Sequence, residues 1–207
     1  MTVALSQLGL FAAAFALAIA SPGPVAAAIV ARAMAFGFAP GAAMALGAVV
    51  GDIVFAVAAM TGLAALSAWF EAGVVALKYL GAAWLIWLGW RLLTAPAAAL
   101  RAPGARPSRG ALLRSFTQGA VVNLGNPKAM LFYLAVFPGF FDVARLTPTD
   151  AAAILGVIVA LCVSGGLVWA ALAARAGRAF ASARAVRAVN RISGGALGAA
   201  GLAIAAS

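Results

Sequence analysis

The chain has 207 residues, of which 66% are hydrophobic and 9% are charged, and its mean hydropathy is +1.12. A soluble domain carries about 25% charged residues, so this composition excludes a water-exposed surface and indicates an integral membrane protein. The net charge of +10 would favour nucleic acid in a soluble protein. Here the arginines stand between apolar runs, as in basic loops that flank membrane spans, so we expect no nucleic-acid partner.

Six long apolar runs predict transmembrane helices, because a span needs about 20 apolar residues. Continuous runs favour helices over a barrel, whose strands alternate apolar and polar residues. The predicted fold class is all-α integral membrane, with about six transmembrane helices. The runs cover residues 8–33, 41–66, 72–93, 112–139, 150–173 and 190–206.

The first run is read as a retained span, because no charged residue precedes Arg32 and a signal peptide needs a basic start. Residues 94–111 are rich in Pro, Gly and Arg and predict a cytoplasmic linker. This linker divides a single membrane domain into a first three-span repeat, residues 1–93, and a second three-span repeat, residues 112–207.

The loop charges predict the orientation of the spans. The connections from an odd to an even span carry eleven cations, whereas the other side carries mostly acidic residues. Basic loops stay in the cytoplasm, so we expect both termini on the periplasmic side of a bacterial inner membrane. The eleven cations are Arg32, Arg91, Arg101, Arg106, Arg109, Arg114, Arg175, Arg178, Arg184, Arg187 and Arg191; the other side has Glu71, Asp142, Arg145 and Asp150.

Two spans contain proline motifs near their middle, and each motif predicts a broken helix because proline removes a backbone donor and clashes with the preceding turn. The breaks occupy corresponding positions in the two halves, in spans one and four. Each half has an odd number of spans, so the halves run in opposite directions, as in inverted-repeat transporters. The motifs comprise Ser21, Pro22, Gly23 and Pro24 in span one, and Asn123, Asn126, Pro127 and Lys128 in span four.

A broken helix exposes N–H groups and carbonyls whose partial charges suit the carboxylate and ammonium of a zwitterion. The motifs are therefore candidate substrate sites, and the alternative is a pair of kinks that only shape packing. Asn123 and Asn126 share a helical face and can bind substrate or cap the helix ends. Further candidates for the same pathway are Gln118 and Tyr133.

Asp52 lies near the middle of span two, where a carboxylate is costly unless it is paired, protonated or facing water. It is a candidate carrier of a coupling proton, and the alternative is a structural ion pair. We favour Lys128 as its partner, although Lys128 can also contact a substrate carboxylate. Lys78 is a second candidate partner that can instead extend to the outer face.

Small residues recur at helical spacing in two places, which allows close helix approach. Ala43, Gly47 and Gly51 form a stripe that we expect to pack within the molecule. Gly194 and Gly198 form another, which can join the halves or support a homo-oligomer.

The chain contains no histidine and one cysteine, Cys162. Zinc, haem and serine-hydrolase chemistry therefore lack their usual ligand or base. We expect no metal site, no cofactor, no internal disulfide and no enzyme activity.

Several motifs in order resemble the lysine exporter and homoserine/threonine exporter (LysE/RhtB) superfamily. They are residues 21–24, Gly47 to Asp52, residues 78–89, and residues 116–129 followed by Phe132 and residues 137–141. The resemblance implies a bacterial inner-membrane exporter of amino acids or close derivatives, driven by protons, with both breaks and Asp52 in the transport site. One departure is Gly139, where family members commonly have a polar residue. The alternatives are efflux of a metal cation or toxic metabolite, and a non-transporting membrane assembly protein.

Overall fold

The computed structural model describes residues 2–61 and 107–179, with scattered positions in 79–94 and 191–202. All regular elements in these residues are helices, in agreement with the predicted class. Most of the predicted third and sixth spans lies outside the described residues, as do Lys78 and most of the linker.

The first predicted span is a broken helix, as its prolines predict. Helix α1 (Leu5–Ala20) and helix α2 (Pro24–Phe36) meet at an angle of 54°, and together they are long and apolar enough to cross a membrane. Ser21 has the extended backbone that a following proline favours. Pro24 occupies the first position of α2, where its missing N–H removes no helical hydrogen bond.

The fourth predicted span is also broken. Helix α5 (Arg109–Leu124) ends at Gly125, and helix α6 (Pro127–Leu131) begins after Asn126 at an angle of 50°. The helix continues through a π-helical turn, η3 (Phe132–Val136), and a 3₁₀ turn, η4 (Phe137–Gly139). Helix α5 begins three residues before the predicted span because the side chain of Ser108 caps it.

Among the described residues, two helices are long and apolar enough to cross a membrane by themselves. Helix α3 (Phe38–Met60) follows Gly37, whose φ of +88° lies in the region that glycine favours. Helix α7 (Pro148–Ala179) follows the short 3₁₀ turn η5 (Val143–Arg145). Helix α7 confirms the predicted helix at 150–173, and α3 confirms the predicted helix at 41–66 as far as Met60; residues 62–66 lie outside the described residues.

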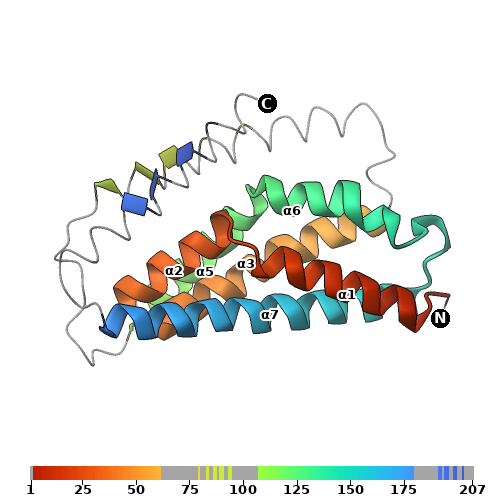
Figure 1. The fold of residues 1–207 in the computed structure, drawn as a ribbon, viewed down its shortest axis with the longest axis horizontal. Helices are drawn as coiled ribbons and strands as arrows, with labels where there is room; N and C mark the ends of the chain where they lie inside the picture. Colours follow the sequence, from red (N-terminus) through yellow and green to blue (C-terminus); the bar gives the residue numbers. More distant parts are fainter. Residues whose placement is uncertain are drawn as a thin grey trace.

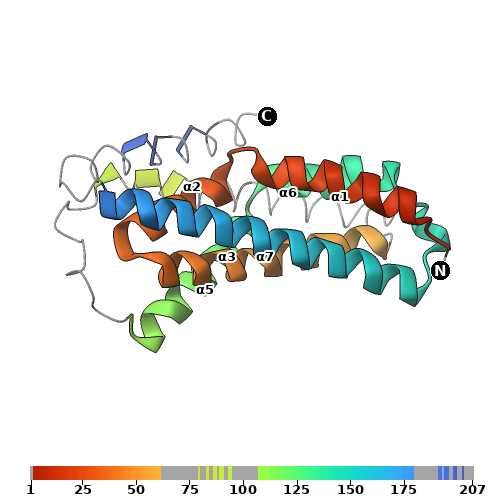
Figure 2. The same ribbon diagram turned by 60° about the horizontal axis from the view of Figure 1, so that its bottom comes forward.

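The two broken helices run through the bundle in opposite directions. Figure 1 shows α1 and α6 toward the end that holds the N-terminus, and α2 and α5 toward the other end. Figure 2 shows α7 running along α1 and α2. The two breaks therefore lie near the middle of the bundle, beside α3 and α7.

Helices α3 and α5 touch through their backbones. A Cβ atom on Gly47 would lie 1.8 Å from the Phe116 carbonyl oxygen, and one on Gly119 would lie 1.9 Å from the Met44 carbonyl oxygen. The first glycine stripe therefore packs within the molecule, as predicted. The second stripe also has an internal neighbour, because a Cβ on Gly89 would lie 2.6 Å from the Gly194 carbonyl oxygen.

Buried contacts join the two halves at the end that holds the N-terminus. The rings of Phe11 and Phe141 lie 5.0 Å apart, and those of Phe15 and Phe132 lie 5.1 Å apart. The fully buried carboxylate of Asp150 accepts hydrogen bonds from the Thr2 backbone N–H at 3.0 Å and its hydroxyl at 2.7 Å. These contacts fix α1 against the fourth and fifth predicted spans.

Candidate functional site

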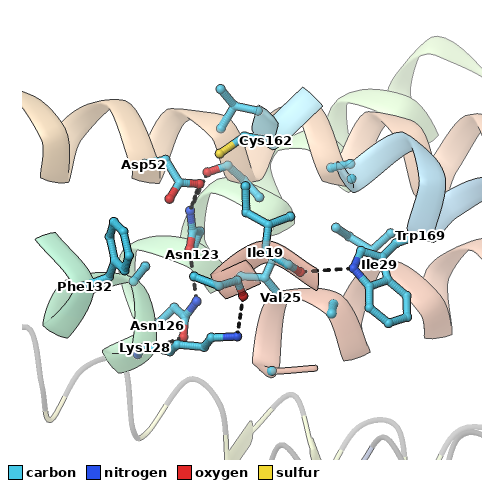
Figure 3. Close-up of a pocket in the computed structure, with 18 of the residues that line it drawn as sticks. Ile19, Val25, Ile29, Asp52, Asn123, Asn126, Lys128, Phe132, Cys162 and Trp169 are labelled. Carbon is cyan, nitrogen blue, oxygen red and sulfur yellow. Dashed lines mark hydrogen bonds between the residues drawn. The ribbon is translucent and has the colours of Figure 1, made fainter. Parts of the chain in front are cut away.

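A cavity of about 100 Å³ lies where the two breaks meet α3 and α7. Figure 3 shows side chains from all of these elements around it. Most of its wall is apolar, and its polar groups are concentrated on the two breaks and on α3. The polar residues that line it are Ser21, Asp52, Asn123, Asn126, Lys128 and Cys162.

Asp52 is held by neutral groups in this structure. The Asn123 side-chain amide donates to Asp52 Oδ2 at 2.7 Å, and the Tyr133 hydroxyl donates to Oδ1 at 3.3 Å. The Cys162 side chain lines the same cavity from α7. In the described part of the chain the ion pair joins Arg145 to Asp142, so Asp52 lacks a charged partner among those residues.

Lys128 bonds to the end of α1 instead of to Asp52. Its ammonium donates to the Ala18 carbonyl and the Ser21 carbonyl, each at 2.7 Å, and to the Ser21 hydroxyl at 3.0 Å. The expected pairing of Lys128 with Asp52 is therefore absent from this conformation. The physical reason is that the last carbonyls of a helix carry partial negative charge and lack helical donors.

The two asparagines connect Asp52 to the second break. Asn123 also donates to the Ala48 carbonyl at 2.7 Å, and Asn126 donates to Asn123 Oδ1 at 3.2 Å. The Asn126 side-chain oxygen accepts from the Lys128 backbone N–H at 3.2 Å and so caps α6. Capping, one of the two roles considered for these amides, is thus present for Asn126.

The end of α1 is capped by the second half of the chain, whereas the residue before α2 gives that helix no side-chain cap. The Trp169 indole N–H on α7 donates to the Ile19 carbonyl at 3.3 Å, beside the Lys128 contacts. The residue before α2, Gly23, has no side chain to accept from the first N–H groups. Val25 and Ala26 line the cavity, so the start of α2 borders it.

The remaining predicted residues take other places. Pro24 and Pro127 each begin a half-helix, and Pro22 stops α1, so the prolines shape the breaks. Tyr133 reaches Asp52 from outside the cavity lining. Gln118 is half-buried on α5 and does not line the cavity.

Sequence reasoning missed the contribution of α7. Cys162, Gly166 and Trp169 all line the cavity from this helix. Their spacing of four and three residues places them on one helical face. That spacing was the available signal, but it is hard to recognise in a helix that is apolar on every side.

Residues 16–207 match the family described as LysE type translocator. The chain belongs to this family. It is 37% identical over 143 residues to an uncharacterized membrane protein of Synechocystis sp., covering 68% of each chain. It is 33% identical over 153 residues to a leucine efflux protein of Klebsiella pneumoniae, covering 71% of this chain and 70% of the relative. A leucine efflux protein of Enterobacter sp. is 36% identical over 126 residues, 59% of this chain and 58% of the relative.

No solved structure matches the chain. The family match confirms the resemblance drawn from the motifs. The chain belongs to a translocator family and contains apolar helices long enough to cross a membrane. It is therefore a multi-pass membrane transporter.

Proposed function

We propose that this LysE-type translocator exports a small amino acid, or a close derivative, with an apolar side chain across the bacterial inner membrane. The observation that carries the proposal is the cavity at the two helix breaks, which combines groups of both polarities with apolar walls. The leucine efflux relatives support the same substrate class.

The cavity offers a binding group to each charged group of a zwitterion. The uncapped start of α2 offers the Val25 and Ala26 N–H groups to a carboxylate. Asp52 and the α1 carbonyls offer negative charge to an ammonium. Ile19, Ile29 and Phe132 provide apolar surface for the side chain.

Transport proceeds by alternating access between two inverted three-span halves. The packing supports this symmetry, because α3 packs on the fourth span and α7, its counterpart in the second half, packs on the first span. The cavity is lined by residues of both halves, where alternating access places a substrate site.

A proton is the proposed coupling ion, and Asp52 its carrier. The carboxylate lines the cavity and is held by neutral donors, so a change in its charge breaks no ion pair among the described residues. No cofactor is required. The basic loops face the cytoplasm and both termini face the periplasm in this proposal.

Proteoliposomes loaded with a panel of labelled amino acids test the proposal, with and without an imposed pH gradient. We expect saturable, gradient-dependent release of an apolar amino acid such as leucine. If folded protein releases none of the amino acids, the proposal is wrong, and other solutes or a non-transport role take its place.

A further inference from the structure

We propose that the Lys128 ammonium occupies the position of the substrate's own ammonium, and that a primary ammonium on the substrate displaces it during transport. This inference rests on the proposed function for the identity of the ligand. The site itself, the ammonium cage, consists of the Ala18 carbonyl, the Ser21 carbonyl and the Ser21 hydroxyl.

The geometry of the cage matches a primary ammonium. The three oxygens lie 2.7, 2.7 and 3.0 Å from the Lys128 nitrogen, and an ammonium group has three N–H donors. The oxygens lie at the C-terminal end of α1, where the helix dipole favours a cation. A tertiary amide or a trimethylated amine would lack these donors.

The bound lysine is suited to exchange. Its partners in the cage are neutral, and charged partners would hold it more strongly. The Lys128 stem lies over Gly23, where an added Cβ would be 3.3 Å from Lys128 Cδ. Ser21 is exposed and lines the cavity together with Ala18 and Lys128, so the cage opens onto the space that a substrate would enter.

The cage also joins the two halves. Ala18 and Ser21 belong to the first break, whereas Lys128 follows the second break. While Lys128 is in place, it holds these breaks together across the cavity. A substrate ammonium in the cage releases that contact, which couples binding to separation of the halves and limits opening without substrate.

The Lys128→Met variant tests the cage because methionine keeps an unbranched side chain and removes the ammonium. Thermal unfolding of the purified protein is followed with added n-butylammonium. We expect Tm to rise by about 3 °C, while tetramethylammonium and 4-methylpentanoate leave it unchanged. The wild type and the matched control Lys128→Arg keep a cation that n-butylammonium must displace, so their Tm should rise by less. No response of Lys128→Met, or an equal response of the wild type, overturns the proposal.

Leucine binding to the same variants separates displacement from a purely structural role. Removal of the internal competitor should lower the Kd of Lys128→Met for leucine by about tenfold. A lysine that binds the substrate carboxylate predicts the opposite, with weaker binding of both leucine and 4-methylpentanoate, and that result overturns the proposal.

The tests remain decisive if the variant folds poorly. A Lys128→Met protein that purifies only with n-butylammonium supports the cage, whereas one that stays misfolded with the amine while Lys128→Arg folds overturns it. If the wild type exports no amino acid but Lys128→Met responds to n-butylammonium, the proposed function is wrong and the ammonium cage is still supported. If the wild type exports leucine and the Tm of Lys128→Met does not change with n-butylammonium, the displacement proposal is wrong and the proposed function is still supported.

Discussion

The two helix breaks share a proline-based origin but differ in how their free backbone groups are satisfied. The first helix of each break ends alike, since Ser21 donates to the Leu17 carbonyl and Gly125 donates to the Val121 carbonyl. The second break also has a local side-chain cap, because Asn126 accepts from the Lys128 N–H. The first break depends on distant groups, Lys128 and Trp169, and the residue before α2 supplies no cap. A self-capped break can act as a rigid support, whereas a break capped from the opposite half can change partners. We therefore assign ligand exchange to the first break and structural support to the second.

The largest effect is expected for Asp52→Asn, because Asp52 contacts the second break through Asn123 and faces the first across the cavity. A charge-assisted contact is worth up to about 3 kcal/mol, which corresponds to about a hundredfold in rate. Gradient-driven leucine efflux should fall by that factor, while the isosteric amide keeps the fold. Proteoliposome efflux measures it, and coupled transport at the wild-type rate would exclude Asp52 as the proton carrier.

Gly119→Ala should disturb the support of the second break. The new methyl group would lie 1.9 Å from the Met44 carbonyl oxygen, and such overpacking costs about 1–3 kcal/mol. Thermal unfolding in detergent should show a clear fall in Tm. Gly156→Ala is the matched control, because a Cβ there meets nothing within 4 Å. Equal Tm values for the two variants would contradict the close α3–α5 contact.

Asn126→Ala should lower stability by about 1 kcal/mol through loss of the α6 cap. It also removes the 3.2 Å hydrogen bond to Asn123. We expect the fall in Tm to be accompanied by little change in leucine KM, since this break is assigned a supporting role. A large rise in KM with unchanged Tm would instead place substrate on Asn126.

The smallest effect is expected for Trp169→Phe, which removes the donor to the Ile19 carbonyl and keeps an aromatic ring. One neutral hydrogen bond changes the leucine KM by about threefold. Tm should barely move, which is the reverse of the result at Asn126. A fall in the Tm of Trp169→Phe with an unchanged leucine KM would contradict the assignment of ligand exchange to the first break and support to the second.

Local chemistry made the two helix breaks predictable, whereas the long-range hydrogen-bond partners of their residues could not be predicted. Pro22, Pro24 and Pro127 disrupt helices wherever they stand, so the sequence located both discontinuities within a residue or two. Asp52 was recognisable because a carboxylate in an apolar run is rare. The partner of Lys128 could not be deduced, since a helix-end carbonyl and a carboxylate both attract an ammonium. The choice between them depends on how α6 packs against α1.

The roles of Asp150 and Trp169 were missed for a similar reason. Asp150 entered the sequence argument as a loop charge, but it is buried and binds the backbone of Thr2 and Val3 across the fold. Trp169 looked like one more apolar residue in α7. In both cases the partner lies more than 140 residues away, and no local pattern records such a pairing.

The central claim is that the first break, together with Asp52 on α3, recognises both charged ends of an apolar amino acid. Uptake of leucine, isopentylamine and 4-methylpentanoate into wild-type proteoliposomes by exchange against internal leucine tests it most directly. We predict saturable exchange for leucine, which has both groups, and at most slow exchange for the analogues that lack its carboxylate or its ammonium. Exchange of either analogue as fast as leucine, or failure of folded protein to exchange leucine, would contradict the account.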